Sequence, residues 1–183
     1  FLAIRHLGSD RMPALFAAKA RLDALSWLPA SLSDRLAQWL ADRLPGHLPA
    51  RLTAFRDRYE HHLMLRMADE GIDEARAWLA SHFPSASGAF FECSDEEGEA
   101  AFLHRFAAAG AAVRYRAVHP REVEDIVALD IALPRNCDAW VEELPEAVGR
   151  HVLHRLYYGH FLCHVFHQDY IVAKGTCCAA LEQ

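Results

Sequence analysis

Histidines carry most of the chemistry that this sequence offers. Twelve occur among 183 residues, and five of them lie in two dense groups: His61 with His62, and His160 with His164 and His167. A neutral imidazole binds divalent metal ions and acts as a base near pH 7. The two groups are therefore the first candidates for a catalytic or metal site, although a single histidine is more often a packed or solvent-facing side chain.

The spacing inside each group limits which imidazoles reach one pocket. Successive side chains of a strand point to opposite faces of the sheet. His61 and His62 therefore diverge, and His160 and His167, seven residues apart, also diverge if one regular strand carries both. A bulge or a bend between His160 and His167 is needed to bring both to one site.

Other kinds of site find little support. The sequence contains no G-x-G-x-x-G or G-x-x-x-x-G-K-[ST] phosphate cradle, no G-x-S-x-G and no C-x-x-C. Its five cysteines are odd in number and lack zinc spacing, so we interpret them as free thiols. A metal-dependent hydrolase remains an alternative, but the histidine groups have few acidic neighbours apart from Glu60 and Asp169.

Charge divides the sequence into two parts. Residues 1–66 contain ten basic and six acidic side chains, a net charge of +4, whereas residues 67–183 carry a net charge of −10. A basic segment is attracted to an anionic membrane surface, which repels an acidic body. The acidic body and the absence of a base-stacking motif argue against a nucleic-acid partner, so we expect none.

The basic part contains an amphipathic helix signal. Ser33 and Asp34 are typical of a helix start, and Pro45 ends the pattern. Between them, apolar side chains recur at three- and four-residue spacing, at Leu36, Trp39, Leu40 and Leu44. Such helices lie flat in a membrane interface, but they also pack on one another as a small helical subdomain. Both interpretations are open on the pattern alone.

The remaining patterns predict an α+β fold. We expect a largely antiparallel sheet with flanking helices, because several strand patterns follow one another without a helical crossover. The expected strands are residues 1–7, 60–67, 89–93, 113–118, 125–133 and 157–172. The expected helices are residues 72–83, 95–109 and 145–156. Because the sequence begins at Phe1 rather than Met, we expect it to be a piece of a longer protein.

Several long strings of the sequence resemble the respiratory, quinone-dependent D-lactate dehydrogenases of bacteria. They are RYEHHL (58–63), AFLHRFAAAGAAVRY (101–115), VEDIVALDIAL (123–133) and LYYGHFLCHVFHQDYIV (156–172), with shorter similarities in 7–13 and 44–52. The resemblance extends from about Phe1 to Gly175. It implies a peripheral membrane flavoprotein with non-covalent FAD, in which a cap domain on an antiparallel sheet carries an inserted, basic, membrane-binding segment.

This resemblance assigns parts to the chain. It implies that residues 1–12 and 59–183 form the cap, or substrate, domain, and that residues 13–58 form the inserted helical membrane-binding segment. The FAD-binding domain is absent from this chain. The implied membrane contacts are Trp27, Leu28, Arg35, Leu36, Trp39, Leu40 and Arg43. The implied location is the cytoplasmic face of the bacterial inner membrane, as a peripheral protein on an anionic surface.

The resemblance also implies a reaction and its residues. The parent protein would oxidise D-lactate to pyruvate, passing hydride to FAD and then electrons to a quinone. Gly159-His160 and His167 match the Gly-His, six residues, His pattern of FAD-linked oxidases, whose histidines often hold a divalent metal. Cys163–Phe166 replace the usual Gly-Asp-Gly-Asn core. We therefore predict His160 and His167 as catalytic residues and metal ligands, with His61 and His62 as further catalytic candidates. The alternative is a non-catalytic, cap-like module that binds membrane or a partner.

Overall fold

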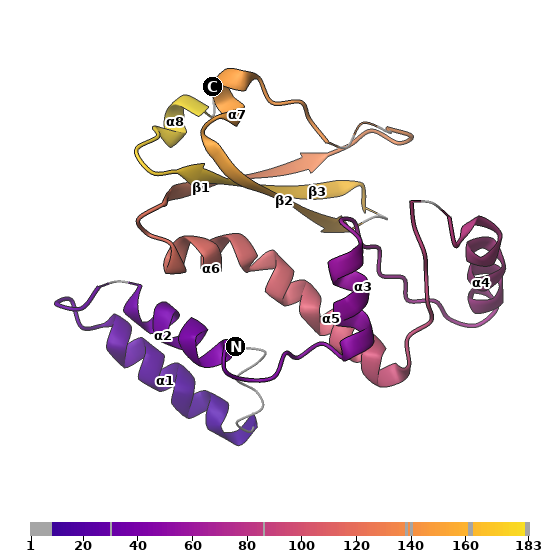
Figure 1. The fold of residues 1–183 in the computed structure, drawn as a ribbon, viewed down its shortest axis with the longest axis horizontal. Helices are drawn as coiled ribbons and strands as arrows, with labels where there is room; N and C mark the ends of the chain where they lie inside the picture. Colours follow the sequence, from indigo (N-terminus) through magenta and orange to yellow (C-terminus); the bar gives the residue numbers. More distant parts are fainter. Residues whose placement is uncertain are drawn as a thin grey trace. The chain divides into compact units, whose positions relative to one another are not determined.

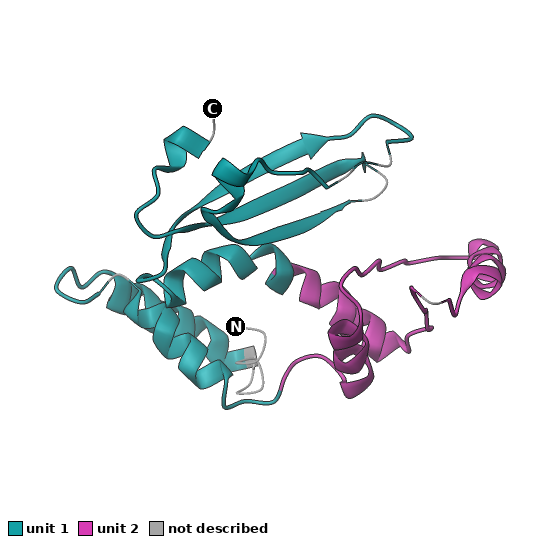
Figure 2. Cartoon of the chain, turned by 45° about the horizontal axis from the view of Figure 1, so that its top comes forward, with its two compact units in different colours: residues 1–45, 107–183 teal, residues 46–106 magenta. Residues whose placement is uncertain are grey.

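The structure is a computed structural model that describes residues 9–29, 31–85, 87–137, 139, 141–160 and 163–181. The expected strand at residues 1–7 lies outside the described residues. The chain divides into two compact units, residues 1–45 with 107–183 (unit 1) and residues 46–106 (unit 2) (Figure 2). The domain boundaries expected from the sequence stay a prediction.

Unit 1 contains the sheet and most of the described elements. They are η2 (Ser9–Arg11), α1 (Met12–Asp23), α2 (Leu32–Ala41), α6 (Ala111–Val118), β1 (Val123–Ala132), α7 (Glu146–Gly149), β2 (Val152–His160), β3 (Val165–Ala173) and α8 (Cys178–Leu181). Unit 2 contains α3 (Ala50–Arg58), α4 (Gly71–His82) and most of α5 (Asp95–Ala109).

The three strands form an antiparallel sheet in the order β1-β3-β2. In unit 1, α6 lies on one side of this sheet, and α7 and α8 lie on the other (Figure 1). The prediction of an α+β fold with a largely antiparallel sheet and flanking helices is therefore confirmed.

The core of unit 1 follows from the alternation along β3. Ile171 points to the α6 side, where it packs with Ala112 and Val123. Its neighbours Tyr170 and Val172 point to the opposite side and pack with Val127. Both faces of the central strand are thus covered, which explains why β3 is the most buried strand.

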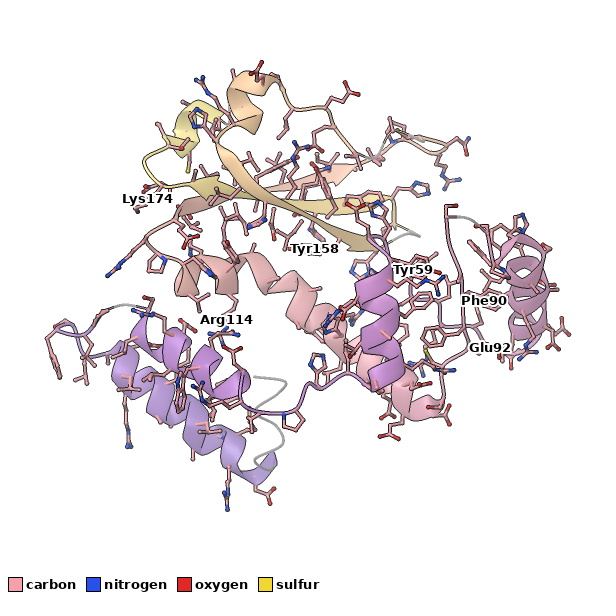
Figure 3. All side chains as sticks on the ribbon, viewed as in Figure 1. Tyr59, Phe90, Glu92, Arg114, Tyr158 and Lys174 are labelled. Atoms are coloured by element: carbon pink, nitrogen blue, oxygen red, sulfur yellow. The ribbon has the colours of Figure 1, made fainter. Side chains whose placement is uncertain are left out.

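Residues 113–118 were predicted to be a strand, and this prediction is wrong, because they belong to α6. Alternating apolar and basic residues also fit a short helix when one apolar side faces a sheet. Ala112 and Tyr115, three residues apart, both pack into the core on the α6 side. Arg114 points the other way, toward α2 (Figure 3), where it donates hydrogen bonds to the backbone oxygen and the carboxylate of Asp34.

The predictions for residues 145–172 are also wrong. The helix expected at 145–156 is reduced to α7, Glu146–Gly149, because β2 begins at Val152. The long strand expected at 157–172 is instead two strands, β2 and β3, joined as a hairpin. His164 stands in the connection with φ +53°, a left-handed conformation that reverses the chain. A continuous β-type pattern does not by itself show where such a reversal falls.

Residues 60–67 and 89–93 are the other two incorrect strand predictions. Both are described, and neither forms a strand with another described residue. Side chains rather than a ladder hold the second segment, since Phe91 packs on Phe55 with ring centroids 4.8 Å apart. Arg76 also binds both carboxylate oxygens of Glu92.

The helix predictions for unit 2 are confirmed. α4 follows a turn at Asp69 and Glu70, and α5 begins after Ser94. The Ser94 Oγ accepts a hydrogen bond from the Glu97 amide at 3.3 Å, while the Glu97 carboxylate accepts one from the Ser94 amide at 2.9 Å. This reciprocal pair is a capping box, which satisfies two amides that the first turn leaves unpaired.

A partly buried polar network joins α1 and α2. The Lys19 Nζ donates hydrogen bonds to Asp23 at 2.7 Å and to the hydroxyl of Ser33 at 2.9 Å. Ser33, which is buried, donates in turn to the second oxygen of Asp23. Asp34 continues this network to Arg114 of α6 at 2.9 Å. The sequence suggests Ser33 and Asp34 as caps, but α2 begins at Leu32, and the two side chains instead contact Lys19 of α1.

Candidate functional site

The hairpin brings His160 and His167 to one face of the sheet. Tyr158 of β2 lies opposite His167 of β3, and His160 lies opposite Val165. Directly opposed residues share a face, as do residues two apart along a strand. His160, Tyr158 and His167 therefore share the side on which α6 packs. The sequence required a bulge or a bend between the two histidines to bring them to one face, and the reversal between β2 and β3 is such a bend.

A glycine permits the close approach of the two strands at this point. Gly159 lies opposite Phe166, and a Cβ atom added to it would collide with the backbone carbonyl of Val165. Any larger residue would push β2 away from β3 next to His160. The Gly-His pair noted in the sequence is therefore explained by the geometry of the hairpin.

Asp130 of β1 orients the imidazole of His167. The two residues lie opposite each other across β1 and β3, and the Asp130 Oδ1 contacts the His167 Nδ1. An ionised carboxylate only accepts hydrogen bonds, so Nδ1 must carry a proton. The lone pair of a neutral His167 is then on Nε2. The His167 side chain is 33% exposed. Solvent or a ligand therefore reaches its imidazole.

Tyr158 adds a neutral hydroxyl beside the imidazole. Its ring centroid lies 5.1 Å from that of His167, and its hydroxyl donates a hydrogen bond to the Asp169 Oδ2 at 3.1 Å. Burial raises the pKa of Tyr158, and the hydrogen bond to Asp169 and the charges of Asp169 and Asp130 raise it further. The phenol therefore stays protonated at neutral pH. Figure 3 labels Tyr158 on the sheet.

Sequence reasoning missed Asp130 and Tyr158, and it named Asp169 only as an acidic neighbour of the histidines. A signal was present, since Asp130 interrupts the apolar run of β1 and Asp169 interrupts that of β3. A buried carboxylate such as that of Asp169 needs a hydrogen-bond partner, whereas Asp130 is exposed. The sequence did not show which residue lies opposite.

His61 and His62 belong to unit 2, whereas His160 and His167 belong to unit 1. Both are exposed in an extended segment, and the ring of His62 meets the edge of Phe55 at a centroid distance of 6.4 Å. His160 is also exposed. A hollow beside α6 is lined by Tyr115, His154 and other residues, and none of the four predicted histidines lines it.

The donor set for a metal ion is small. In the part of the chain that the structure describes, no three His, Cys, Asp or Glu side chains come together in an arrangement that holds a metal ion. Protein sites for divalent ions generally supply three or four such ligands. His160 and His167 alone supply too few ligands for such a site. Metal binding by these two residues stays a prediction.

A second histidine pair lies inside unit 2. The His47 Nε2 and the His104 Nδ1 are 2.8 Å apart, and their rings stack with centroids 4.9 Å apart. Burial lowers the pKa of His104 below its ordinary value of 6.5, and the positive charges of His47, Arg56 and His62 lower it further. The contact therefore favours a neutral His104.

We expect the intact protein to lose thermal stability as pH falls below about 6.5. In that range His104 takes up a proton in the unfolded chain but stays neutral in the folded chain, where its pKa is lowered. The unfolded state therefore binds more protons and is favoured as the pH falls. Above that range both states are neutral and the contribution vanishes. Thermal unfolding between pH 8 and 5.5 measures the effect. His104→Phe should flatten the acid side of the curve and His82→Phe should not; equal curves would contradict the prediction.

Three of the predicted membrane contacts are exposed large apolar side chains on α2 and in the turn before it. Trp27 is 77% exposed, Trp39 55% and Leu36 48%, whereas Leu28 and Leu40 are half-buried. Arg35 and Arg43 are exposed, and the Arg43 guanidinium lies 3.8 Å from the centroid of the Trp39 ring. Along the described residues, no helix combines the length and the apolar character needed to cross a membrane.

Comparison with known proteins covers the whole chain. The model of the family "D-lactate dehydrogenase, membrane binding" matches residues 1–183. The chain is 53% identical to the quinone-dependent D-lactate dehydrogenase of Escherichia coli K12, over 100% of this chain and 33% of that protein. It is 49% identical to the Haemophilus influenzae Rd protein of the same name, over 96% and 32%, respectively. A protein of that name from Corynebacterium glutamicum is 38% identical, over 83% and 27%.

The chain thus spans about a third of the length of these relatives. The family model matches every residue of the chain. This match agrees with the resemblance that the sequence strings indicate. The chain belongs to the D-lactate dehydrogenase membrane-binding family.

Proposed function

We propose that this chain is the cap and membrane-binding part of a peripheral membrane flavoenzyme. The enzyme oxidises D-lactate to pyruvate and passes the electrons through FAD to a respiratory quinone. The observation that carries the proposal is the match to the family over residues 1–183, together with 53% identity to a quinone-dependent D-lactate dehydrogenase. FAD is assigned to the part of the protein outside these residues.

His167 is proposed as the base of this reaction. Oxidation of D-lactate removes a hydride from C2 and a proton from the hydroxyl group. FAD, when bound in the longer protein, accepts the hydride and its two electrons. The hydroxyl proton goes to the Nε2 of His167, whose lone pair is fixed there by the contact between Nδ1 and Asp130. No step depends on a metal ion.

The neighbours of His167 support the substrate assignment. Tyr158 keeps its proton, because burial and Asp169 raise its pKa. It donates that proton to Asp169, so toward the substrate its oxygen acts as a hydrogen-bond acceptor. His160 is exposed on the same face, two residues from Tyr158. We assign contact with the lactate carboxylate to His160, while His61 and His62 remain further catalytic candidates.

The membrane contact is proposed to be the surface of Trp27, Leu36 and Trp39 with the basic residues around it. Exposed tryptophan and leucine side chains insert at the boundary between headgroups and acyl chains. Exposed arginines such as Arg35 and Arg43 favour an anionic leaflet, at about 1 kcal/mol for each cation near the surface. We place this contact on the cytoplasmic face of the bacterial inner membrane.

Anaerobic titration of the intact protein tests the reaction. We expect a flavin absorption that D-lactate bleaches and a quinone analogue restores, because hydride transfer reduces the flavin and quinone reoxidises it. L-lactate at the same concentration is the control and should leave the spectrum unchanged. An intact protein without flavin, or with a flavin indifferent to D-lactate, would contradict the proposal and favour the non-catalytic module.

A further inference from the structure

One acidic side chain of β3 is buried beside the proposed base. Asp169 is 8% exposed, and among the described residues it is the one buried aspartate or glutamate. It lies two residues from His167 along the strand, so both side chains point to the side of the sheet on which α6 packs. A buried carboxylate costs stability unless its hydrogen bonds are made. Packing alone therefore does not explain why an acid occupies this position.

The apolar neighbours of Asp169 lead to the same conclusion. On its face of the sheet, Leu156 lies opposite Asp169 and packs against the core cluster of Ile171, the next β3 residue to point to that side. A leucine at position 169 would continue this apolar surface. Replacement of a buried charged group by a well-packed apolar one is often neutral or stabilising. Positions at which a protein departs from such packing are commonly functional.

The partner of Asp169 is a side chain that flanks the imidazole of His167. The Tyr158 hydroxyl donates a hydrogen bond to the Asp169 Oδ2 at 3.1 Å. The Tyr158 ring (labelled in Figure 3) lies 5.1 Å from that of His167 between centroids, with 31° between the ring planes. Tyr158 lies directly opposite His167 and therefore diagonally across from Asp169, within reach of both. The hydrogen bond fixes the phenol where it limits rotation of the imidazole.

His167 is in this way held from both neighbouring strands. Asp130 of β1 contacts its Nδ1, and the ring of Tyr158 flanks it from β2. The first contact fixes which nitrogen carries the lone pair, whereas the second limits the orientation of the ring. A general base must be aimed at the proton that it removes, and a displacement of about 1 Å can lower a rate by about 100-fold.

We propose that Asp169 is a positioning residue for the proton transfer from D-lactate to His167. It acts through Tyr158: its carboxylate fixes the phenol, and the phenol limits the imidazole to the orientation in which Nε2 accepts the proton. No contact of Asp169 itself with the substrate or the cofactor is needed. The inference rests on the proposed function, because it concerns the base of that reaction.

The rate of anaerobic flavin reduction by saturating D-lactate, measured in the intact protein, tests this inference. We expect Asp169→Leu to lower the rate by at least about tenfold, because the ring of His167 is no longer held in one orientation. Asp169→Asn keeps an oxygen that accepts the Tyr158 proton, so its rate should stay within about threefold of the unmodified protein. In a Tyr158→Phe background, Asp169→Leu should have no further effect, because no hydroxyl remains for it to hold.

Gln168, the preceding residue of β3, provides a matched control. It is 3% exposed and accepts a hydrogen bond from the Tyr170 hydroxyl at 2.8 Å, the same kind of contact on the opposite side of the sheet. Gln168→Leu takes this acceptor from a buried hydroxyl, so we expect its thermal unfolding midpoint to fall while flavin reduction stays within about threefold. Asp169→Leu should show the reverse, with slow reduction and an unfolding midpoint at least as high as that of the unmodified protein.

The contrary outcomes are distinct. An Asp169→Leu rate within about threefold of the unmodified protein, or an equal loss with and without the Tyr158 hydroxyl, would overturn the inference. A slower rate that Asp169→Asn does not restore, together with a lower unfolding midpoint, would assign Asp169 to the fold alone. A flavin that D-lactate fails to reduce in the unmodified protein would contradict the proposed function and this inference with it. An active unmodified protein with an equally active Asp169→Leu variant would contradict this inference only.

Discussion

Replacement of His167 by alanine in the intact enzyme is expected to lower D-lactate turnover by about 100-fold or more, the scale of a lost acid–base group. The physical reason is the contact between Asp130 and the Nδ1 of His167, which leaves Nε2 as the proton acceptor. The measurement is steady-state reduction of a quinone analogue by D-lactate, with flavin content checked for each variant. The flavin content shows whether the fold of the enzyme survives the substitution.

The sheet offers matched variants for this test. His154→Ala removes an imidazole from the same face, where it contacts the Tyr115 hydroxyl at 3.1 Å and lies away from Asp130. It should change turnover by less than about threefold, because it takes no part in the proton transfer. Asp130→Ala should lower kcat while KM changes little, since it misorients His167 without removing the base. A loss below about threefold for His167→Ala would exclude it as the general base.

Replacement of Trp27 and Trp39 by alanine and Leu36 by serine is expected to weaken liposome binding by at least about tenfold. Burial of one large apolar side chain contributes roughly 1.5–3 kcal/mol, and 1.4 kcal/mol corresponds to a factor of ten. The three side chains are exposed and not part of the core, so the fold should survive. Co-sedimentation of the intact protein with vesicles rich in phosphatidylglycerol measures the change.

The control for this variant is another exposed tryptophan. Trp78 of α4 is 58% exposed but lies outside the predicted membrane segment. Trp78→Ala should bind vesicles like the unmodified protein. If the triple variant co-sediments with vesicles as well as Trp78→Ala does, α2 and its preceding turn are not the membrane contact.

The sequence determined the features that depend on neighbours along the chain. The capping box of Ser94 and Glu97 marks the start of α5, because its two hydrogen bonds join residues three apart. The apolar run that becomes β1 and the helical spacing of α2 are equally local. The sequence also indicated the candidate site residues, because the spacing of Gly159, His160 and His167 is visible without the fold. His160 and His167 remain the residues on which the proposed reaction depends.

Tertiary structure decided what depends on distant partners. Residues 113–118 alternate like a strand, yet they form a helix because Ala112 and Tyr115 pack against the sheet. The segment at 61–67 has a strand pattern, but it is not part of the sheet that the described residues form, because sheet pairing depends on the tertiary fold and not on the local pattern.

The reversal after His160 had the largest effect on the site. It places His160 and His167 on one face and sets His167 opposite Asp130, although the spacing alone had separated the two histidines. Spacing along one strand fixes alternation, whereas the register between strands fixes which side chains meet. The register that sets His167 opposite Asp130 depends on the pairing of β1 with β3, two strands that lie far apart in the sequence, so no local pattern reveals it.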